Sequence, residues 1–244
     1  MKIAVAGGTG VVGTHVVDVA RERGHDVVVL TRSSGVDLLD GAGLTDALAG
    51  VGSVIDVTSK QTMSAKESTH FFTTVTRNLL AAEKAAGVGH HVALSIVGSD
   101  KAPHGYYAGK VAQEKTIGDG DVPWTVLRAT QFHEFAGQIY GQVKFGPLVV
   151  VPKMRSQPIA AREVAERLVD LAEGSPNGLV PEFGGPNEEL IADMVRAHAA
   201  SLAEKPLIIE VPIPGAYGRA MRDGTLLTGP GADLGTQTFR DWLG

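Results

Sequence analysis

A tyrosine and a lysine stand four residues apart in the segment YYAGK, and Ser95 precedes them at the end of an apolar run. Residues at i and i+4 share one face of a helix, so a helix from about Tyr106 would carry Tyr106 and Lys110 side by side. An ammonium nearby favours the phenolate and lowers the pKa of a tyrosine from its usual value near ~10. Such a tyrosine can act as general acid or base toward a carbonyl or alcohol, and Ser95 could bind the same oxygen.

A glycine-rich turn near the start of the chain gives this pair a context. Gly7-x-x-Gly10-x-x-Gly13 lies between an apolar run at 2–6 and a helical pattern that continues to Arg23. Glycine permits a positive φ and lets the backbone approach a pyrophosphate, and the helix N-terminus offers free N–H groups to phosphates. A strand before the turn and a helix after it favour a dinucleotide site over a purely structural turn. Its predicted contacts are Gly7, Thr9, Gly10, Val11, Val12 and Gly13.

The end of the second predicted strand indicates which dinucleotide is bound. NAD-binding proteins usually carry an acidic residue about 20 positions beyond the glycines, which accepts the ribose 2′-hydroxyl. Here the strand ends in Thr31, Arg32 and Ser33, without a carboxylate. A guanidinium between two hydroxyls suits a 2′-phosphate, so NADP(H) is favoured over NAD(H). The alternative is that Arg32 is only a solvated charge at a strand end.

Strand and helix patterns alternate along the first half of the chain. Apolar runs at 2–6, 25–32, 53–59, 91–98 and 124–130 read as strands, and helical patterns separate them at 11–23, 43–50, 68–86 and 106–117. Strands apolar at consecutive positions are covered on both faces, as in a parallel sheet. The predicted fold class is therefore α/β, a Rossmann-type doubly wound parallel sheet with helices on both faces.

The pattern changes after about residue 131, where prolines divide the chain into shorter elements. Helices are predicted at 161–173 and 188–202 and a strand at 206–213. We expect a dinucleotide-binding domain over 1–130, with room for further C-terminal strands, and a smaller α/β substrate-binding lobe over 131–244. Because ligands bind beyond the carboxyl ends of the strands in open α/β sheets, this lobe is expected to close the substrate side.

Three residues after the strand at 124–130 are predicted to line the substrate pocket. Gln131, Phe132 and His133 follow that strand at the predicted mouth of the sheet. The alternative for His133 is a histidine packed between the two lobes. The other histidines are scattered, and the adjacent His90 and His91 would point to opposite sides of a strand, so no metal site is expected.

Composition limits the remaining function classes. The 244 residues are 43% hydrophobic, contain 31 glycines and no cysteine, and carry a formal net charge of −5. A chain without cysteine has no disulfide framework and no thiolate metal site. It has no apolar run long enough for a membrane span and no basic cluster for nucleic acid. We expect a cytoplasmic protein without a secretory leader that binds a small-molecule substrate; the oligomeric state is left open.

Taken together, the motifs resemble the short-chain dehydrogenase/reductase superfamily. GGTGVVG, SIVGSD and YYAGKVAQEK carry the resemblance, and LRATQFHEF and QPIAAREVAERL are similar to its atypical, NmrA-like NAD(P)H-binding branch. The resemblance implies that Ser95 and Tyr106 bind and protonate the substrate oxygen, while Lys110 holds the nicotinamide ribose. It also implies that Asp37 and Leu38 flank the adenine and that Thr58 and Ser59 lie beside the cofactor. Neither Thr74 nor Asn78 matches the active-site asparagine of many members.

The predicted function is an NADP(H)-dependent oxidoreductase that reduces a small carbonyl, quinone or activated alkene, or oxidises the alcohol. Some NmrA-like proteins regulate rather than catalyse, and those members typically lack the tyrosine–lysine pair that is intact here. A redox-sensing NADP(H)-binding protein without turnover is the alternative. An isomerase or epimerase that uses bound nicotinamide transiently is a third, less favoured interpretation.

Overall fold

A computed structural model describes the backbone of residues 1–244 and every side chain except that of Phe145. The chain forms two compact units, Met1–Arg128 with Arg162–Val180, and Ala129–Ala161 with Pro181–Gly244. The first break lies two residues from the boundary that the sequence predicts. Residues 162–180 return to the first unit, which the sequence pattern does not indicate.

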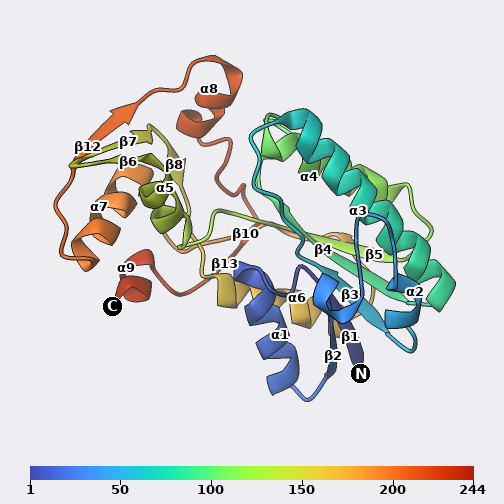
Figure 1. Cartoon of the computed structure of the whole chain (residues 1–244). Coiled ribbons are helices and arrows are strands. Elements are labelled where there is room, and N and C mark those ends of the chain that lie inside the picture. The colour runs from blue at the N-terminus through green and yellow to red at the C-terminus, as the bar shows by residue number, and fades with distance from the viewer. The chain divides into compact units, whose positions relative to one another are not determined.

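The first unit is the predicted Rossmann-type α/β fold with a parallel sheet (Figure 1). Its elements are β1 (Lys2–Ala6), α1 (Val11–Glu22), β2 (Asp26–Leu30), a 3₁₀ turn (Arg32–Ser34), α2 (Leu44–Ala47), β3 (Ser53–Asp56), α3 (Ala65–Ala86), β4 (His90–Ile96), α4 (Tyr106–Gly118), β5 (Trp124–Ala129), α6 (Ala161–Glu173) and β9 (Gly178–Leu179). The strand order is β2-β1-β3-β4-β5, and β9 pairs with β5. Strand β1 pairs in parallel with both β2 and β3, so the chain reverses its direction across the sheet there. Such a switch point opens a ligand crevice at the carboxyl ends of the strands.

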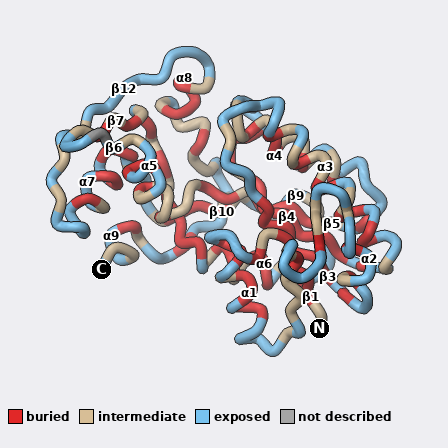
Figure 2. The backbone as a smooth tube through the Cα atoms, in the orientation of Figure 1, coloured by how far each residue is buried: buried red, intermediate tan, exposed pale blue. Residues whose placement is uncertain are grey.

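Burial of the strands and of one face of each helix forms the core of this unit. Strands β3 and β4 are buried along almost their whole length, as the red segments of Figure 2 show. Helix α1 buries Val12, Val16, Val17 and Ala20, the residues that its period predicts. Helices α3 and α4 approach closely at Gly109, where a Cβ would lie 2.1 Å from Ser68 Oγ. The two helices that carry site residues therefore pack as one body against the sheet.

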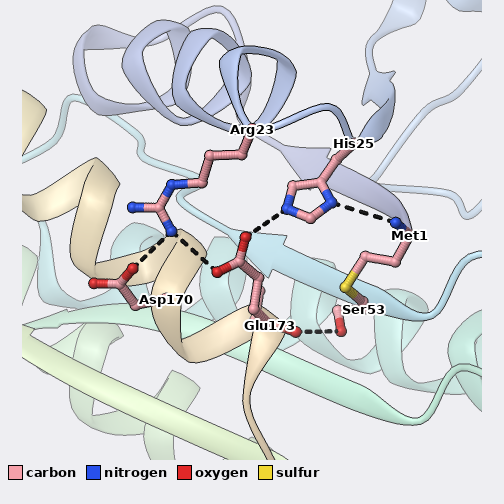
Figure 3. A network of polar contacts seen from close by, with 7 residues as sticks. Met1, Arg23, His25, Ser53, Asp170 and Glu173 are labelled. Carbon is pink, nitrogen blue, oxygen red and sulfur yellow. Dashed lines mark hydrogen bonds and ion pairs between the residues drawn. The ribbon is translucent and has the colours of Figure 1, made fainter.

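A polar network at the amino ends of the strands holds α6 to the first unit (Figure 3). Arg23 at the end of α1 contacts Asp170 at 2.6 Å and Glu173 at 3.0 Å, both on α6. His25 reaches Glu173 at 2.6 Å, and Ser53 Oγ on β3 donates to the carbonyl of Ala172 at 2.9 Å. These contacts join α1, β3 and α6, and they explain why residues 162–180 belong to the first unit.

The second unit contains shorter elements. They are α5 (Phe135–Val143), β6 (Lys144–Phe145), β7 (Leu148–Pro152), β8 (Arg155–Ser156), β10 (Phe183–Gly184), β11 (Glu189–Leu190), α7 (Ile191–Ser201), β12 (Leu207–Val211), α8 (Gly215–Asp223), β13 (Asp233–Leu234) and α9 (Phe239–Leu243). Strand β12 pairs in parallel with β7, which pairs antiparallel with β6. The predicted helix at 188–202 and strand at 206–213 are α7 and β12. Among the residues that the structure describes, no helix is long and apolar enough to cross a membrane.

Candidate cofactor and catalytic site

The glycine turn has the backbone that the sequence predicts. Gly7 has φ +83°, and a Cβ on it would lie 2.7 Å from the carbonyl oxygen of Val57. A Cβ on Gly13 would lie 2.1 Å from the carbonyl oxygen of Gly7, so the turn and the first turn of α1 touch backbone to backbone. The space around Gly10 is more open, because a Cβ there would have one close neighbour, the carbonyl oxygen of Gly7 at 3.3 Å. The three glycines thus match the three roles in a phosphate-binding turn. Gly7 allows the tight bend, Gly10 leaves room for the ligand, and Gly13 allows close packing of the helix.

The N-terminus of α1 is open toward the same edge. Gly10 is its N-cap residue, without a side-chain cap and without an acidic residue in the first turn. The first N–H groups of the helix are therefore available to an anion. A glycine cradle that side chains would fill, together with this uncapped helix, fits a dinucleotide pyrophosphate.

Strand β3 ends beside the turn, on the other side of the switch point. The Cβ of a residue at position 7 would lie 2.9 Å from the Cα of Thr58. The amide of Thr58 donates to Asp56 Oδ1 at 2.9 Å, and its Oγ1 is buried without a hydrogen-bond partner among the described residues. Ser59 follows and is exposed. The structure thus places Thr58 against the glycine turn, with Ser59 next in the chain, and Thr58 Oγ1 is a buried group that a ligand could satisfy.

The end of β2 provides the predicted cation. Thr31 caps a short 3₁₀ turn by accepting from the amide of Ser34, and Ser33 Oγ lies 3.0 Å from Thr31 Oγ1. Arg32 is exposed and has no ion-pair partner among the described residues. Its guanidinium is therefore available to a ligand at the carboxyl edge of the sheet.

The segment that the resemblance assigns to the adenine is braced by α3. Asp37 Oδ1 accepts from the amide of Leu39 at 2.8 Å, which closes a tight turn. The side-chain amide of Asn78 donates to the carbonyls of Leu38 at 3.0 Å and Leu39 at 2.9 Å. Asn78 therefore supports this loop.

Tyr106 begins α4 and is held in place from α3. Its ring meets that of Phe72 edge to face at a centroid distance of 5.4 Å, and its carbonyl accepts from Ser68 Oγ at 2.8 Å. Its phenol oxygen lies 3.0 Å from Ser59 Oγ. The tyrosine is thus brought to the strand end that carries Thr58 and Ser59.

Lys110 lies one turn along α4, in a buried polar network. Its Nζ donates to the carbonyl of Leu94 and to Gln113 Oε1, each at 2.7 Å, and Gln113 Nε2 donates to Asp56 Oδ2 at 2.8 Å. Burial lowers the pKa of Lys110 to about 8, against the opposing effects of the Asp56 and Glu114 carboxylates. An ammonium carries three N–H donors, so one remains for a ligand. Sequence reasoning missed Asp56 and Gln113, although Gln113 follows Lys110 at i+3.

The expected lowering of the Tyr106 pKa by Lys110 is wrong in this structure. Burial raises the pKa of Tyr106 to about 12; the hydrogen bond with Ser59 opposes this shift, and the Asp56 carboxylate adds to it. Lys110 is not among the groups that shift this pKa, and its Nζ donates to Leu94 and Gln113. Tyr106 is consequently a protonated phenol at neutral pH.

Ser95 is bound into a second network, through Glu114, which lies one turn beyond Lys110 on α4. Only 2% exposed, it donates to Glu114 Oε1 at 2.5 Å. Arg128 binds Glu114 through two hydrogen bonds at 2.9 and 2.7 Å and also contacts Asp100 at 3.0 Å. The hydrogen bond with Glu114 raises the pKa of Arg128, so the guanidinium stays charged. Glu114 and Arg128 were not anticipated from the sequence.

The three predicted pocket residues belong to the second unit. Ser156 Oγ donates to Gln131 Oε1 at 3.0 Å, and the backbone of Phe132 forms a parallel bridge with Ile159. His133 is fully buried, with its ring 5.7 Å from those of Phe239 and Trp242 and its Nε2 3.2 Å from the carbonyl of Gln237. The role of these three residues in substrate binding stays a prediction.

Comparisons with known proteins agree with this geometry. A family model described as NAD(P)H-binding matches residues 35–174, more than half of the chain. No curated protein matches the sequence. Among solved structures, an NADPH-dependent quinone oxidoreductase from Escherichia coli is 17% identical, with a TM-score of 0.73 over 99% of this chain and 98% of that chain.

Two sugar-nucleotide enzymes have similar folds. A UDP-glucose 4-epimerase from Thermus thermophilus in complex with NAD is 20% identical, with a TM-score of 0.71 over 86% of each chain. A nucleoside-diphosphate-sugar epimerase from Staphylococcus aureus is 15% identical, with a TM-score of 0.70 over 100% of this chain and 99% of that chain. At these identities the likeness concerns the fold alone.

The family match and the cradle lead to one assignment. The family match confirms the NAD(P)H-binding part of the resemblance. The fold is shared with the quinone oxidoreductase and the epimerases above. The chain belongs to the NAD(P)H-binding family.

Proposed function

We propose that the protein is an NADP(H)-dependent oxidoreductase that reduces a small carbonyl, quinone or activated alkene. The observation that carries this proposal is the position of Tyr106, whose phenol meets Ser59 at the strand end beside the glycine turn. A phenol with a pKa of about 12 is protonated at neutral pH, so it is suited to give a proton and not to take one. Reduction is therefore favoured over oxidation of the alcohol.

Each side chain has a task in this proposal. A bound dihydronicotinamide supplies the hydride. Tyr106 gives its proton to the substrate oxygen, and Lys110 uses its remaining N–H donor to hold the ribose. Ser95, predicted to orient the substrate oxygen, would have to exchange Glu114 for the substrate to do so.

NADP(H) is the proposed cofactor because of Arg32. Arg32 is exposed at the end of β2, between Thr31 and Ser33 in the chain, where an NAD-specific site usually carries a carboxylate. Charge-assisted hydrogen bonds from a guanidinium to phosphate are among the stronger polar contacts in proteins.

Removal of the phenolic hydroxyl tests the catalytic proposal. NADPH oxidation is followed with menadione, 1,4-benzoquinone and a panel of aldehydes and ketones, and NADPH affinity is followed by fluorescence. We expect Tyr106→Phe to lower turnover roughly 10²- to 10⁴-fold while the Kd for NADPH changes less than about twofold, because general acid catalysis is lost and the cradle is not.

Tyr140→Phe is the matched control, because that phenol donates to Glu204 in the second unit. It should leave both quantities unchanged. Full turnover in Tyr106→Phe would refute the catalytic assignment. Tight NADPH binding by the native protein without oxidation by any acceptor would instead favour the redox-sensing alternative.

A further inference from the structure

Two serines compete for the role of hydroxyl partner in the proposed reaction. Ser95 is the one that the family resemblance selects. Ser59 was expected only to lie beside the cofactor. The two differ in exposure and in the group to which each hydroxyl is bound.

The hydroxyl of Ser95 is already bound to a neighbouring side chain. Its hydroxyl donates to Glu114, which Arg128 holds through two hydrogen bonds. To reach a substrate, Ser95 would have to leave a charge-assisted hydrogen bond in a buried setting, where an unpaired polar group is unfavourable. The described structure gives Ser95 no contact with Tyr106.

Ser59 has the opposite properties. It is exposed, it follows β3 at the carboxyl edge of the sheet, and its Oγ lies 3.0 Å from the phenol oxygen of Tyr106. Its neighbour Thr58 touches the glycine turn, so the serine stands between the cofactor cradle and the tyrosine. No other hydrogen bond to the phenol oxygen occurs among the described contacts of Tyr106.

Lys110 is not the hydrogen-bond partner of the Tyr106 phenol. Both of its described hydrogen bonds lead into the protein, to the carbonyl of Leu94 and to Gln113. Its Nζ also lies over the ring of Phe72, 4.4 Å from the centroid. The hydrogen bond that links the phenol to an exposed side chain therefore runs to Ser59 and not to the buried lysine.

We propose that Ser59, and not Ser95, is the hydroxyl that positions the Tyr106 proton and returns a proton to it from solvent. The inference rests on the proposed function, since it assumes that Tyr106 is the proton donor. Ser59 acts through the tyrosine and is therefore a positioning residue. Ser95 instead ties β4 to α4 through Glu114.

The proton balance is closed by water. The Oη–H bond of Tyr106 breaks as the substrate oxygen gains the proton. The phenolate oxygen then takes a proton from Ser59, whose oxygen takes one from water. The two electrons enter the substrate with the hydride that the proposed function already requires, so no further reactant is needed.

The experiment compares Ser59→Ala, Ser59→Thr and Ser95→Ala with the native protein and Tyr106→Phe. With menadione as the acceptor, we expect Ser59→Ala to lower kcat about 3- to 10-fold, as befits one lost hydrogen bond, with the Kd for NADPH unchanged. Ser59→Thr keeps the hydroxyl and should restore turnover. Ser95→Ala should lower the urea midpoint, because the bond to Glu114 is lost, and should lower kcat less than Ser59→Ala does.

A second readout needs neither substrate nor cofactor. In protein labelled with 13C at tyrosine Cζ, the Tyr106 resonance is assigned by its loss in Tyr106→Phe. It should shift in Ser59→Ala and stay in place in Ser95→Ala, because the Cζ shift reports the hydrogen bond of the attached oxygen.

The outcomes separate the two proposals. If Tyr106→Phe keeps full turnover, the proposed function fails, whatever the serine variants do. If Tyr106→Phe is inactive while Ser95→Ala loses kcat and Ser59→Ala does not, the assignment of Ser59 is overturned. A weaker Kd for NADPH in Ser59→Ala with unchanged kcat would also overturn it, because the serine would then only bind cofactor.

Discussion

The two ends of the central sheet in the first unit treat polar groups in opposite ways. At the amino ends of the strands, charged groups are paired: Glu83 with His91, and Arg23 and His25 with Glu173. At the carboxyl ends of β1 and β2, the helix N-terminus at Gly10 has no side-chain cap, and Arg32 has no ion-pair partner in the described structure. The amino end holds the fold together, while the carboxyl ends of these two strands keep their donors available for a ligand.

This difference predicts which measurement each end controls. Substitutions at the amino end should change the free energy of unfolding and leave NADPH affinity alone. Substitution of Arg32, at the carboxyl end of β2, should do the reverse. Open donors cost little where water can reach them, whereas a buried charge at the amino end must keep its partner.

The largest effect is expected at the buried pair of Glu83 and His91. Both side chains are inaccessible to solvent, and His91 Nδ1 lies 2.8 Å from Glu83 Oε1. We expect Glu83→Leu to cost about 3–5 kcal/mol of unfolding free energy in urea, because it leaves His91 buried without its counter-charge. The double variant Glu83→Leu/His91→Phe should recover most of that loss. A single-variant cost below about 1 kcal/mol would show that the amino end is not held by this pair.

The same pair predicts a pH dependence. Burial alone would lower the pKa of His91, but the Glu83 carboxylate outweighs it, and the net shift is upward from 6.5. Because the folded pKa exceeds the unfolded one, the stabilisation is fully present below pH about 6.5 and is lost as the pH rises through the folded pKa. Glu83→Leu should lack this decline in urea titrations at successive pH values.

At the carboxyl end, the largest expected change in cofactor affinity is at Arg32. A hydrogen bond to a charged group is worth about 1.5–3 kcal/mol, so Arg32→Ser should weaken NADPH binding roughly 10- to 150-fold. The Kd for NADH and the urea midpoint should not change. Lys101→Ser, which removes another exposed cation of the first unit, is the control. A native protein that prefers NADH would refute the assignment of Arg32.

The sequence predicts the parts of this site that depend on local pattern. Gly7 and Gly13 are recognisable because only glycine fits their backbone contacts, and the strand–turn–helix order is set by hydrophobic period. The hydrogen bonds of Ser59 and Ser95 are not readable in this way. Each depends on which way a strand end turns its hydroxyl and on residues from distant segments, Tyr106 and Glu114.

The same limit explains the return of residues 162–180 to the first unit. Their helix was predicted, but its attachment depends on Asp170 and Glu173 meeting Arg23, almost 150 residues earlier. Similarly, the link from Lys110 through Gln113 to Asp56 joins a helix and a strand. Long-range pairing of this kind leaves no periodic signal in one sequence.

A smaller change in NADPH affinity than that of Arg32→Ser is expected when Lys110 loses its charge. Because burial lowers its pKa to about 8, the ammonium is converted to the amine as the pH rises from 7 to 9. We expect the Kd for NADPH to rise a few-fold over this range, as the attraction between the ammonium and an anionic cofactor disappears. In Asp56→Asn the change should occur at lower pH, since a carboxylate that favours the ammonium is gone. A rise in Kd with the same midpoint in both proteins would exclude Lys110 as its cause.

The smallest effect is expected for the exposed part of the amino-end network. Arg23 and Glu173 are 31% and 35% exposed, so solvent screens their attraction, and Arg23→Gln should cost only about 0.2–1 kcal/mol. Hydrogen bonding with His25, followed by the charge of Arg23, lowers the pKa of Glu173 below 4.5. Its stabilisation is therefore present above pH about 4.5, is lost as the pH falls through the folded pKa, and should shrink in 1 M NaCl. If Arg23→Gln cost as much as Glu83→Leu in urea, the stability of the amino end would depend on surface charge as strongly as on the buried pair.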